Sequence, residues 1–132
     1  THNRIIDGLG KIGVLIKFSE DLEDLNEIGK NLCMHIAASS PKSLSEKDLD
    51  SSLIESEKNI IKEQLKDSGK PDNIVDKMIE GKIKKYFEEV VLLNQKFVMD
   101  PSITIEEYLL QISKQKNSSI QIEKFIRYQL GE

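Results

Sequence analysis

The sequence predicts an α+β fold: a small antiparallel β-sheet packs with helices, and an antiparallel coiled-coil helical hairpin protrudes from them. Three observations lead to this class. Apolar residues alternate near both ends of the chain, they recur every three or four residues in between, and a Gly-Lys-Pro turn separates two long helical stretches. Each terminal strand would expose an apolar face if left alone, so we expect the two to pair in one sheet under the helices.

Residues 11–18, KIGVLIKF, show the alternation of a half-buried strand, with one face formed by Ile12, Val14, Ile16 and Phe18. Glycines at positions 8 and 10 predict a turn before it, so residues 2–6 are expected to pair back as a short strand. Residues 120–129 alternate again. Their period predicts a single apolar face made of Ile120, Ile122, Ile126, Tyr128 and Leu130.

Between the strands the period becomes helical. A first helix is expected from Asp21 to just before Pro41, and its buried face consists of Leu22, Leu25, Ile28, Leu32 and Ile36. Acidic residues in its first turn suit the positive end of the helix dipole. A short helix is expected over 104–113, with Thr104 at its start, followed by a polar loop over 114–119.

Two longer helices are expected over about 45–67 and about 72–93. Gly69 suits a left-handed cap at the end of the first, and Pro71 suits the opening of the second. Because so short a connection forces the helices to turn back on each other, we expect a protruding hairpin whose arms are on the order of 30 Å long. We expect residues 1–132 to form one domain, with this hairpin inserted at about 45–93.

Composition restricts the function classes. A net charge of −4 and a pI near 5.3 argue against direct nucleic-acid binding. No apolar run is long enough to span a membrane and no signal peptide is evident, so we expect a cytoplasmic protein without membrane association. The chain starts without a methionine, which suggests a piece of a longer protein.

The sequence offers little for catalysis. Cys33 has no second cysteine to pair with, and His35, two residues further on, points away from it on a helix. The glycines of GLGKIG precede a strand instead of opening a helix, so they are not a phosphate-binding loop. We therefore expect no catalytic residues, no metal site and no cofactor.

His35 remains the notable polar residue, because it lies on or beside the apolar face of its helix. It is either a hydrogen-bonded core histidine or a partner contact. Small residues follow it at positions 37–40, which leaves room for another chain to approach. We expect His35 to be partly accessible to solvent, and His35→Ala to leave the melting temperature nearly unchanged.

Five stretches in order resemble the elongation factor Ts family: KIGVL, the helix end MHIAASSP, GKPDNIVDKMIEG, QKFVMDP and FIRYQLGE. The resemblance implies a guanine-nucleotide exchange factor that binds GDP-bound elongation factor Tu and promotes GDP release without covalent chemistry. It assigns the contact with Tu to His35 with Met34, and to Ile12 and Gly13 on the first strand. The family's T-D-F-V motif, which also contacts Tu, does not occur in this chain.

A second hypothesis is an association module, in which the hairpin pairs with another protein or a second copy. Exposure of hairpin residues such as Val75 or Ile79 would favour that alternative. A third, a small enzyme built on Cys33 or His35, would need a cleft and a base that the sequence does not provide.

Overall fold

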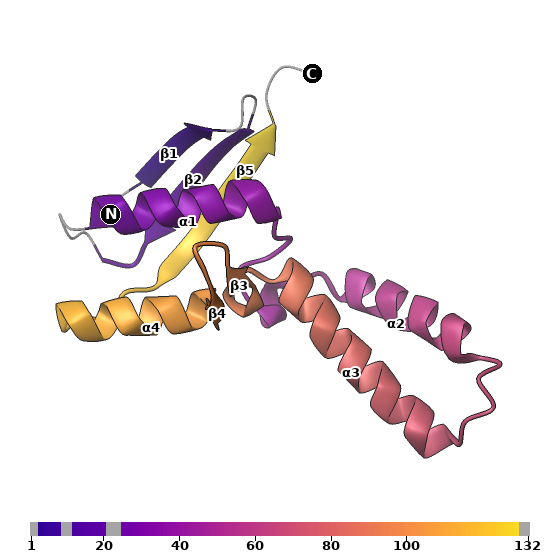
Figure 1. Ribbon diagram of the computed structural model, residues 1–132. Helices are drawn as coiled ribbons and strands as arrows, with labels where there is room; N and C mark the ends of the chain where they lie inside the picture. Colours follow the sequence, from indigo (N-terminus) through magenta and orange to yellow (C-terminus); the bar gives the residue numbers. More distant parts are fainter. Residues whose placement is uncertain (1–2, 9–11, 21–24, 130–132) are drawn as a thin grey trace.

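The computed structural model describes the backbone of residues 3–8 and the whole of residues 12–20 and 25–129. Strands β1 (Asn3–Gly8), β2 (Ile12–Phe18) and β5 (Ile122–Gln129) form an antiparallel sheet in the order β1-β2-β5. Helices α1 (Leu25–Ser39) and α4 (Ile105–Lys116) accompany the sheet, and helices α2 (Ser51–Leu65) and α3 (Asp72–Val90) form a hairpin that projects away from it (Figure 1). The predicted α+β class is confirmed.

The sheet joins the two ends of the chain as expected. β1 pairs with β2 through partners from Asn3–Lys17 to Gly8–Ile12, and β5 lies on the other side of β2. On β2 the predicted apolar face is confirmed, because Val14, Ile16 and Phe18 are fully buried and Ile12 is half-buried. Position 2 of the predicted first strand and positions 21–24 of the predicted first helix lie outside the described residues.

The predicted single face of β5 is wrong, and a β-bulge is the reason. Phe18 pairs with Ile122 whereas Lys17 pairs with Lys124, so the register shifts by one residue at Glu123. An extra residue reverses the alternation of side chains beyond it. Ile122 is therefore buried, while Ile126 and Tyr128 lie on the outer face with exposures of 45% and 39%.

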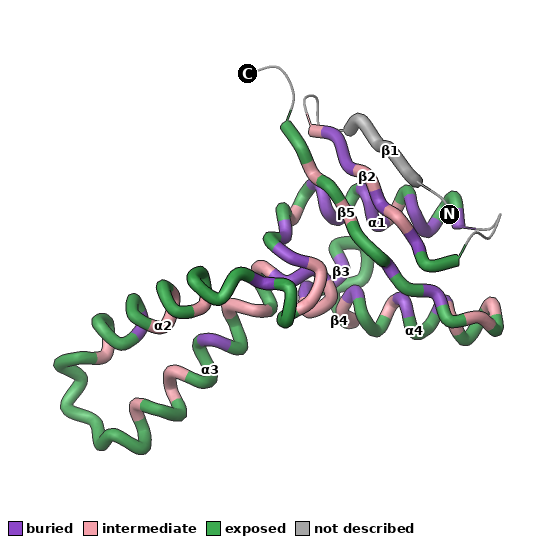
Figure 2. Tube along the Cα trace, turned by 180° about the vertical axis from the view of Figure 1, so that it is seen from behind, coloured by how far each residue is buried: buried purple, intermediate pink, exposed green. Residues whose placement is uncertain are grey.

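The core lies between the sheet, α1 and α4. It contains the apolar residues of β2 together with the buried faces of both helices, including Leu32, Ile36, Leu109 and Ile112. Figure 2 shows buried residues concentrated in this part, whereas the hairpin beyond its base is mostly exposed. Helix α4 begins with a reciprocal cap between Thr104 and Glu107. It ends at Lys116, three residues later than the 113 predicted, and left-handed Asn117 caps that end.

The hairpin turns where the sequence predicts it. Gly69 has a φ of +72°, which a residue with a side chain rarely adopts, and Pro71 caps the start of α3. The ends differ from the prediction: Asp50 caps α2 through a bond from the Ser52 amide, and α3 stops at Val90. Within the arms only Ile61 and Ile83 are buried, so the contact between α2 and α3 is narrow.

Backbone bonds hold the base of the hairpin. The amide of Lys42 donates to Val90 O over 2.7 Å, and the amide of Leu92 donates to Ser43 O over 2.9 Å. Ser43 and Val91 thus form a parallel bridge between the segment entering the hairpin and the segment leaving it. Beyond this base, β3 (Lys96–Phe97) and β4 (Asp100–Thr104) form a second, two-stranded sheet that the sequence analysis did not predict.

Candidate functional site

The residues assigned to partner contact differ in exposure. Met34 on α1 is 49% exposed, Ile12 on β2 is half-buried, and Gly13 is buried. His35 is 0% exposed, although it directly follows Met34 in the chain. The expectation that the His35 imidazole is accessible to solvent is therefore wrong.

The cover over His35 comes from a distant segment, which explains the error. The ring of Phe97 lies with its centroid 5.9 Å from that of His35, and the ring of Tyr108 lies 4.3 Å beyond Phe97. The backbone amide of Val98 donates to His35 Nδ1 over 3.2 Å. The chain's own segment around β3 thus occupies the place beside the imidazole where the sequence predicted another chain.

A buried hydrogen-bond network surrounds the side chain of Gln95. Its Nε2 donates to the carbonyl of Glu89, in the last turn of α3, over 2.8 Å. Its Oε1 lies 2.8 Å from His35 Nε2 and accepts from the Ser39 hydroxyl over 2.9 Å. Gln95 is 4% exposed, and its three side-chain partners come from α1 and α3.

These partners fix the protonation of His35. Because Val98 donates to Nδ1, that nitrogen must be unprotonated, and Nε2 then carries the hydrogen that Gln95 Oε1 accepts. Burial lowers the pKa of His35 below its usual value of 6.5, and the hydrogen bond to Gln95 opposes that effect without overcoming it. His35 is thus a neutral core residue with both ring nitrogens satisfied.

Gly13 is required by a close approach across the sheet. It pairs with Tyr128 on β5, and a Cβ placed on Gly13 would lie 2.5 Å from Tyr128 Cζ. The tyrosine ring therefore lies over the glycine on the outer face of the sheet, which explains why Gly13 is buried. Leu15 and Ile126 form the next pair on this face.

The other candidate chemistry is sparse in the described part of the chain. The Cys33 thiol is directed to Val14 O at 4.0 Å, while both ring nitrogens of His35 are engaged elsewhere. No group of three or more His, Cys, Asp or Glu side chains that could hold a metal ion occurs among the described residues. None of the helices in that same part is long and apolar enough to cross a bilayer.

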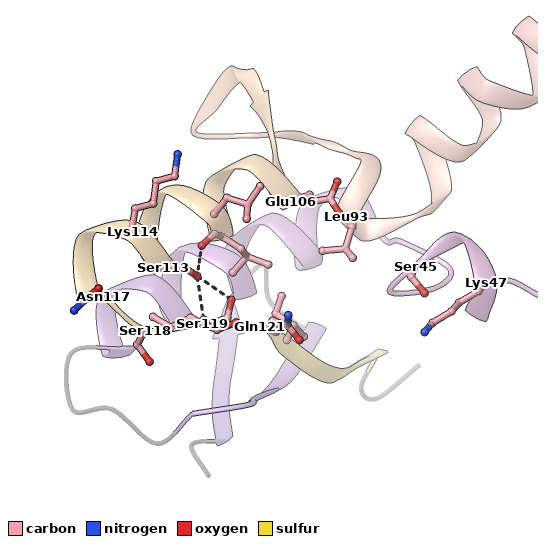
Figure 3. A pocket seen from close by; sticks show the side chains of 14 residues that line it. Ser45, Lys47, Leu93, Glu106, Ser113, Lys114, Asn117, Ser118, Ser119 and Gln121 are labelled. Atoms are coloured by element: carbon pink, nitrogen blue, oxygen red, sulfur yellow. Dashed lines mark hydrogen bonds between the residues drawn. The ribbon is translucent and has the colours of Figure 1, made fainter.

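A hollow of about 720 Å³ lies between α4 and the start of β5, away from His35 (Figure 3). At its wall the Ser113 hydroxyl donates to Leu109 O and accepts from the amide of Ile120. Lys47 and Lys114 lie among residues of mixed polarity around it. These bonds join α4 to the strand that follows, so we assign the hollow no ligand.

Sequence reasoning missed Gln95 as a partner of His35, and it missed Ser39 as the second donor to the same Gln95 oxygen. Their signal was present in part, because QKFVMDP is one of the stretches that carry the family resemblance. The structure shows what that stretch does here: Gln95, Phe97 and Val98 all contact His35.

Comparison with known proteins identifies the family. The family model described as Elongation factor TS matches residues 1–132. The chain belongs to the elongation factor Ts family. Elongation factor Ts of Bartonella henselae is 47% identical to it, that of Paracoccus denitrificans 45% and that of Rickettsia massiliae 42%, each over 99% of this chain.

The same alignments cover 43%, 42% and 43% of those relatives. The chain therefore spans about two fifths of the length of the curated elongation factor Ts proteins it matches.

Proposed function

We propose that this chain takes part in guanine-nucleotide exchange on elongation factor Tu. The observation that carries the proposal is the match of the elongation factor Ts family along all 132 residues. The protein would act in the cytoplasm as a binding partner of the GTPase and not as an enzyme. We also propose that residues 1–132 form one core domain with the hairpin as an insertion.

The mechanism is a difference in affinity. A protein that binds nucleotide-free Tu more tightly than GDP-bound Tu must weaken GDP binding by the same factor, because the two equilibria are linked. Contacts on the protein surface can do this without any covalent step or bound cofactor.

On the protein's own side, we assign the contact to Met34, with half-buried Ile12 at the start of β2 as the second part. Gly13, the next residue, contributes to that part through the Tyr128 ring that covers it. Met34 is the exposed member of this set, and its flexible thioether suits an adaptable apolar contact. His35 contributes from the interior, since its ring is bonded to the segment packed against α1. It supports Met34 and does not touch the partner.

The test is GDP release. Elongation factor Tu loaded with fluorescent GDP is mixed with the protein, and an accelerated loss of fluorescence is expected. Met34→Glu should slow that release, whereas Leu110→Glu, a matched change at a 58% exposed residue of α4, should not. Failure of the protein to bind Tu or to change GDP release at any concentration would overturn the proposal.

One observation favours the association module as a second candidate. Leu53, Ile60 and Ile74 of the hairpin are 36%, 50% and 39% exposed, whereas Val75 and Ile79 are half-buried. Sedimentation of the protein with and without Ile60→Lys tests self-association directly. A monomer at all concentrations would remove this alternative in its self-association form.

A further inference from the structure

Gln95 connects three parts of the fold through one side chain. Its amide bonds to His35 and Ser39 of α1 and to the carbonyl of Glu89 at the end of α3. Its backbone carbonyl accepts from the amide of Ile105, the first residue of α4. The base of the hairpin and the helix that carries Met34 therefore meet at this residue.

The orientation of the Gln95 amide is determined by its partners. The carbonyl of Glu89 can only accept, so it requires the Gln95 NH₂ group, and this places Oε1 toward His35. Oε1 can only accept, so His35 Nε2 must donate and Nδ1 is left to accept from Val98. The chain of bonds runs in one direction, from the Val98 amide through the imidazole and Gln95 to α3.

The surroundings of the imidazole keep it neutral. Gln95, the Val98 amide and the Phe97 ring, which contact it, are uncharged. The ionisable side chains of Glu89, Lys96 and Asp100 on the adjoining segments are exposed. A proton added at Nδ1 would point at the N–H of the Val98 amide, and the turn after β3 would lose its hydrogen bond to His35 on α1.

We propose that Gln95 is a positioning residue for the partner contact. By holding His35 neutral and protonated at Nε2, Gln95 keeps the turn at Val98 hydrogen-bonded to α1. It also joins α1 to the base of the hairpin, so that Met34 is presented on a rigid unit. This inference rests on the proposed contact with Tu, but its main test does not require Tu.

The decisive readouts are the ¹⁵N shifts of the His35 ring and the hydrogen exchange of the Val98 amide. In the unaltered protein the ring should be protonated at Nε2, and Val98 should be protected equally between about pH 8 and pH 6. A ring found protonated at Nδ1 would overturn the inference without any variant.

Two variants separate positioning from simple support. Gln95→Glu places a carboxylate beside Nε2–H, which favours the imidazolium, so Val98 protection should fall about tenfold or more as the pH drops from about 8 to 6. Gln95→Met keeps the size but removes the bonds, so protection should fall at every pH. Gln111→Glu adds the same charge on an exposed part of α4 and should change neither readout.

Binding to Tu provides the functional test of this role. Both Gln95 variants should bind Tu about three- to tenfold more weakly, and for Gln95→Glu the loss should grow as the pH falls. Ile112→Val, which destabilises the buried face of α4 without touching the network, should retain full affinity. Unchanged Tu affinity in Gln95→Met would overturn the positioning role.

These experiments distinguish the proposed contact of Met34 with Tu from the positioning role of Gln95. If Met34→Glu binds Tu normally, the contact assigned to Met34 is wrong, whatever the ring shifts show. If the His35 tautomer and Val98 exchange are the same in both Gln95 variants as in the unaltered protein, the positioning role is wrong, whatever Tu binding shows.

Discussion

Replacing His35 with alanine should destabilise the fold severely, contrary to the expectation from sequence. The substitution removes the bonds at 2.8 Å to Gln95 and at 3.2 Å from Val98. Gln95 Oε1 keeps the Ser39 hydroxyl as a donor, but the Val98 amide loses its acceptor, which costs about 1–3 kcal/mol. The space left by the buried ring beside Phe97 adds about 2 kcal/mol.

The sum is a loss of about 3–5 kcal/mol in the free energy of unfolding. In a domain of this size each kcal/mol lowers the melting temperature by roughly 3–4 °C, so a fall of about 10–20 °C is expected. Thermal and urea unfolding followed by circular dichroism measure both quantities.

Met34→Ala is the matched control, since it truncates the neighbouring, half-exposed residue of the same helix. It should change the free energy of unfolding by no more than about 0.5 kcal/mol. A melting temperature of His35→Ala within about 3 °C of the unaltered protein would refute the reasoning, because a buried ring that makes two hydrogen bonds cannot be lost at so small a cost in stability.

Three further predictions concern pH, the sheet and the partner. Because burial lowers the pKa of His35 in the folded state, the unfolded chain binds more protons below about pH 6.5, so stability should decline as the pH falls through that value. His35→Leu should weaken this dependence of the free energy of unfolding on pH, measured by urea titrations. Gly13→Ala should lower the free energy of unfolding by about 1 kcal/mol, since the new Cβ displaces the Tyr128 ring. Adding Tyr128→Ala should recover most of this loss in a double-mutant cycle, whereas additive losses would contradict the contact between Gly13 and Tyr128. Finally, the 132 residues alone should bind Tu at least about tenfold, or about 1.4 kcal/mol, more weakly than a full-length relative, because they lack the T-D-F-V motif. Equal affinities in a titration would show that the contact with Tu has been assigned to the wrong part of the elongation factor Ts chain.

Sequence patterns predicted those elements whose determinants are local. The hairpin turn follows from Gly69 and Pro71, and the start of α4 follows from Thr104 with Glu107. The buried face of β2 follows from its alternation alone. In each case the residues that decide the structure lie within a few positions of each other.

The errors arise where distant segments meet. The bulge at Glu123 is visible only when β5 is placed against β2, and it reverses the faces of Ile126 and Tyr128. His35 is covered by Phe97 and Val98, more than sixty residues later in the chain, so no helical period could show its burial. The polar residue that draws attention in the sequence is thus part of the interior, while exposed Met34 beside it is the stronger candidate for contact.

The parallel bridge between Ser43 and Val91 makes the length of the hairpin independent of the rest of the fold. The chain leaves for α2 and returns from α3 at one point, closed by backbone bonds on both sides of the bridge. Residues added or removed in equal numbers from both arms would move the tip without changing where either segment joins the sheet and its helices. The reach of the arm can therefore change during evolution, or by engineering, while the geometry around Met34 stays the same.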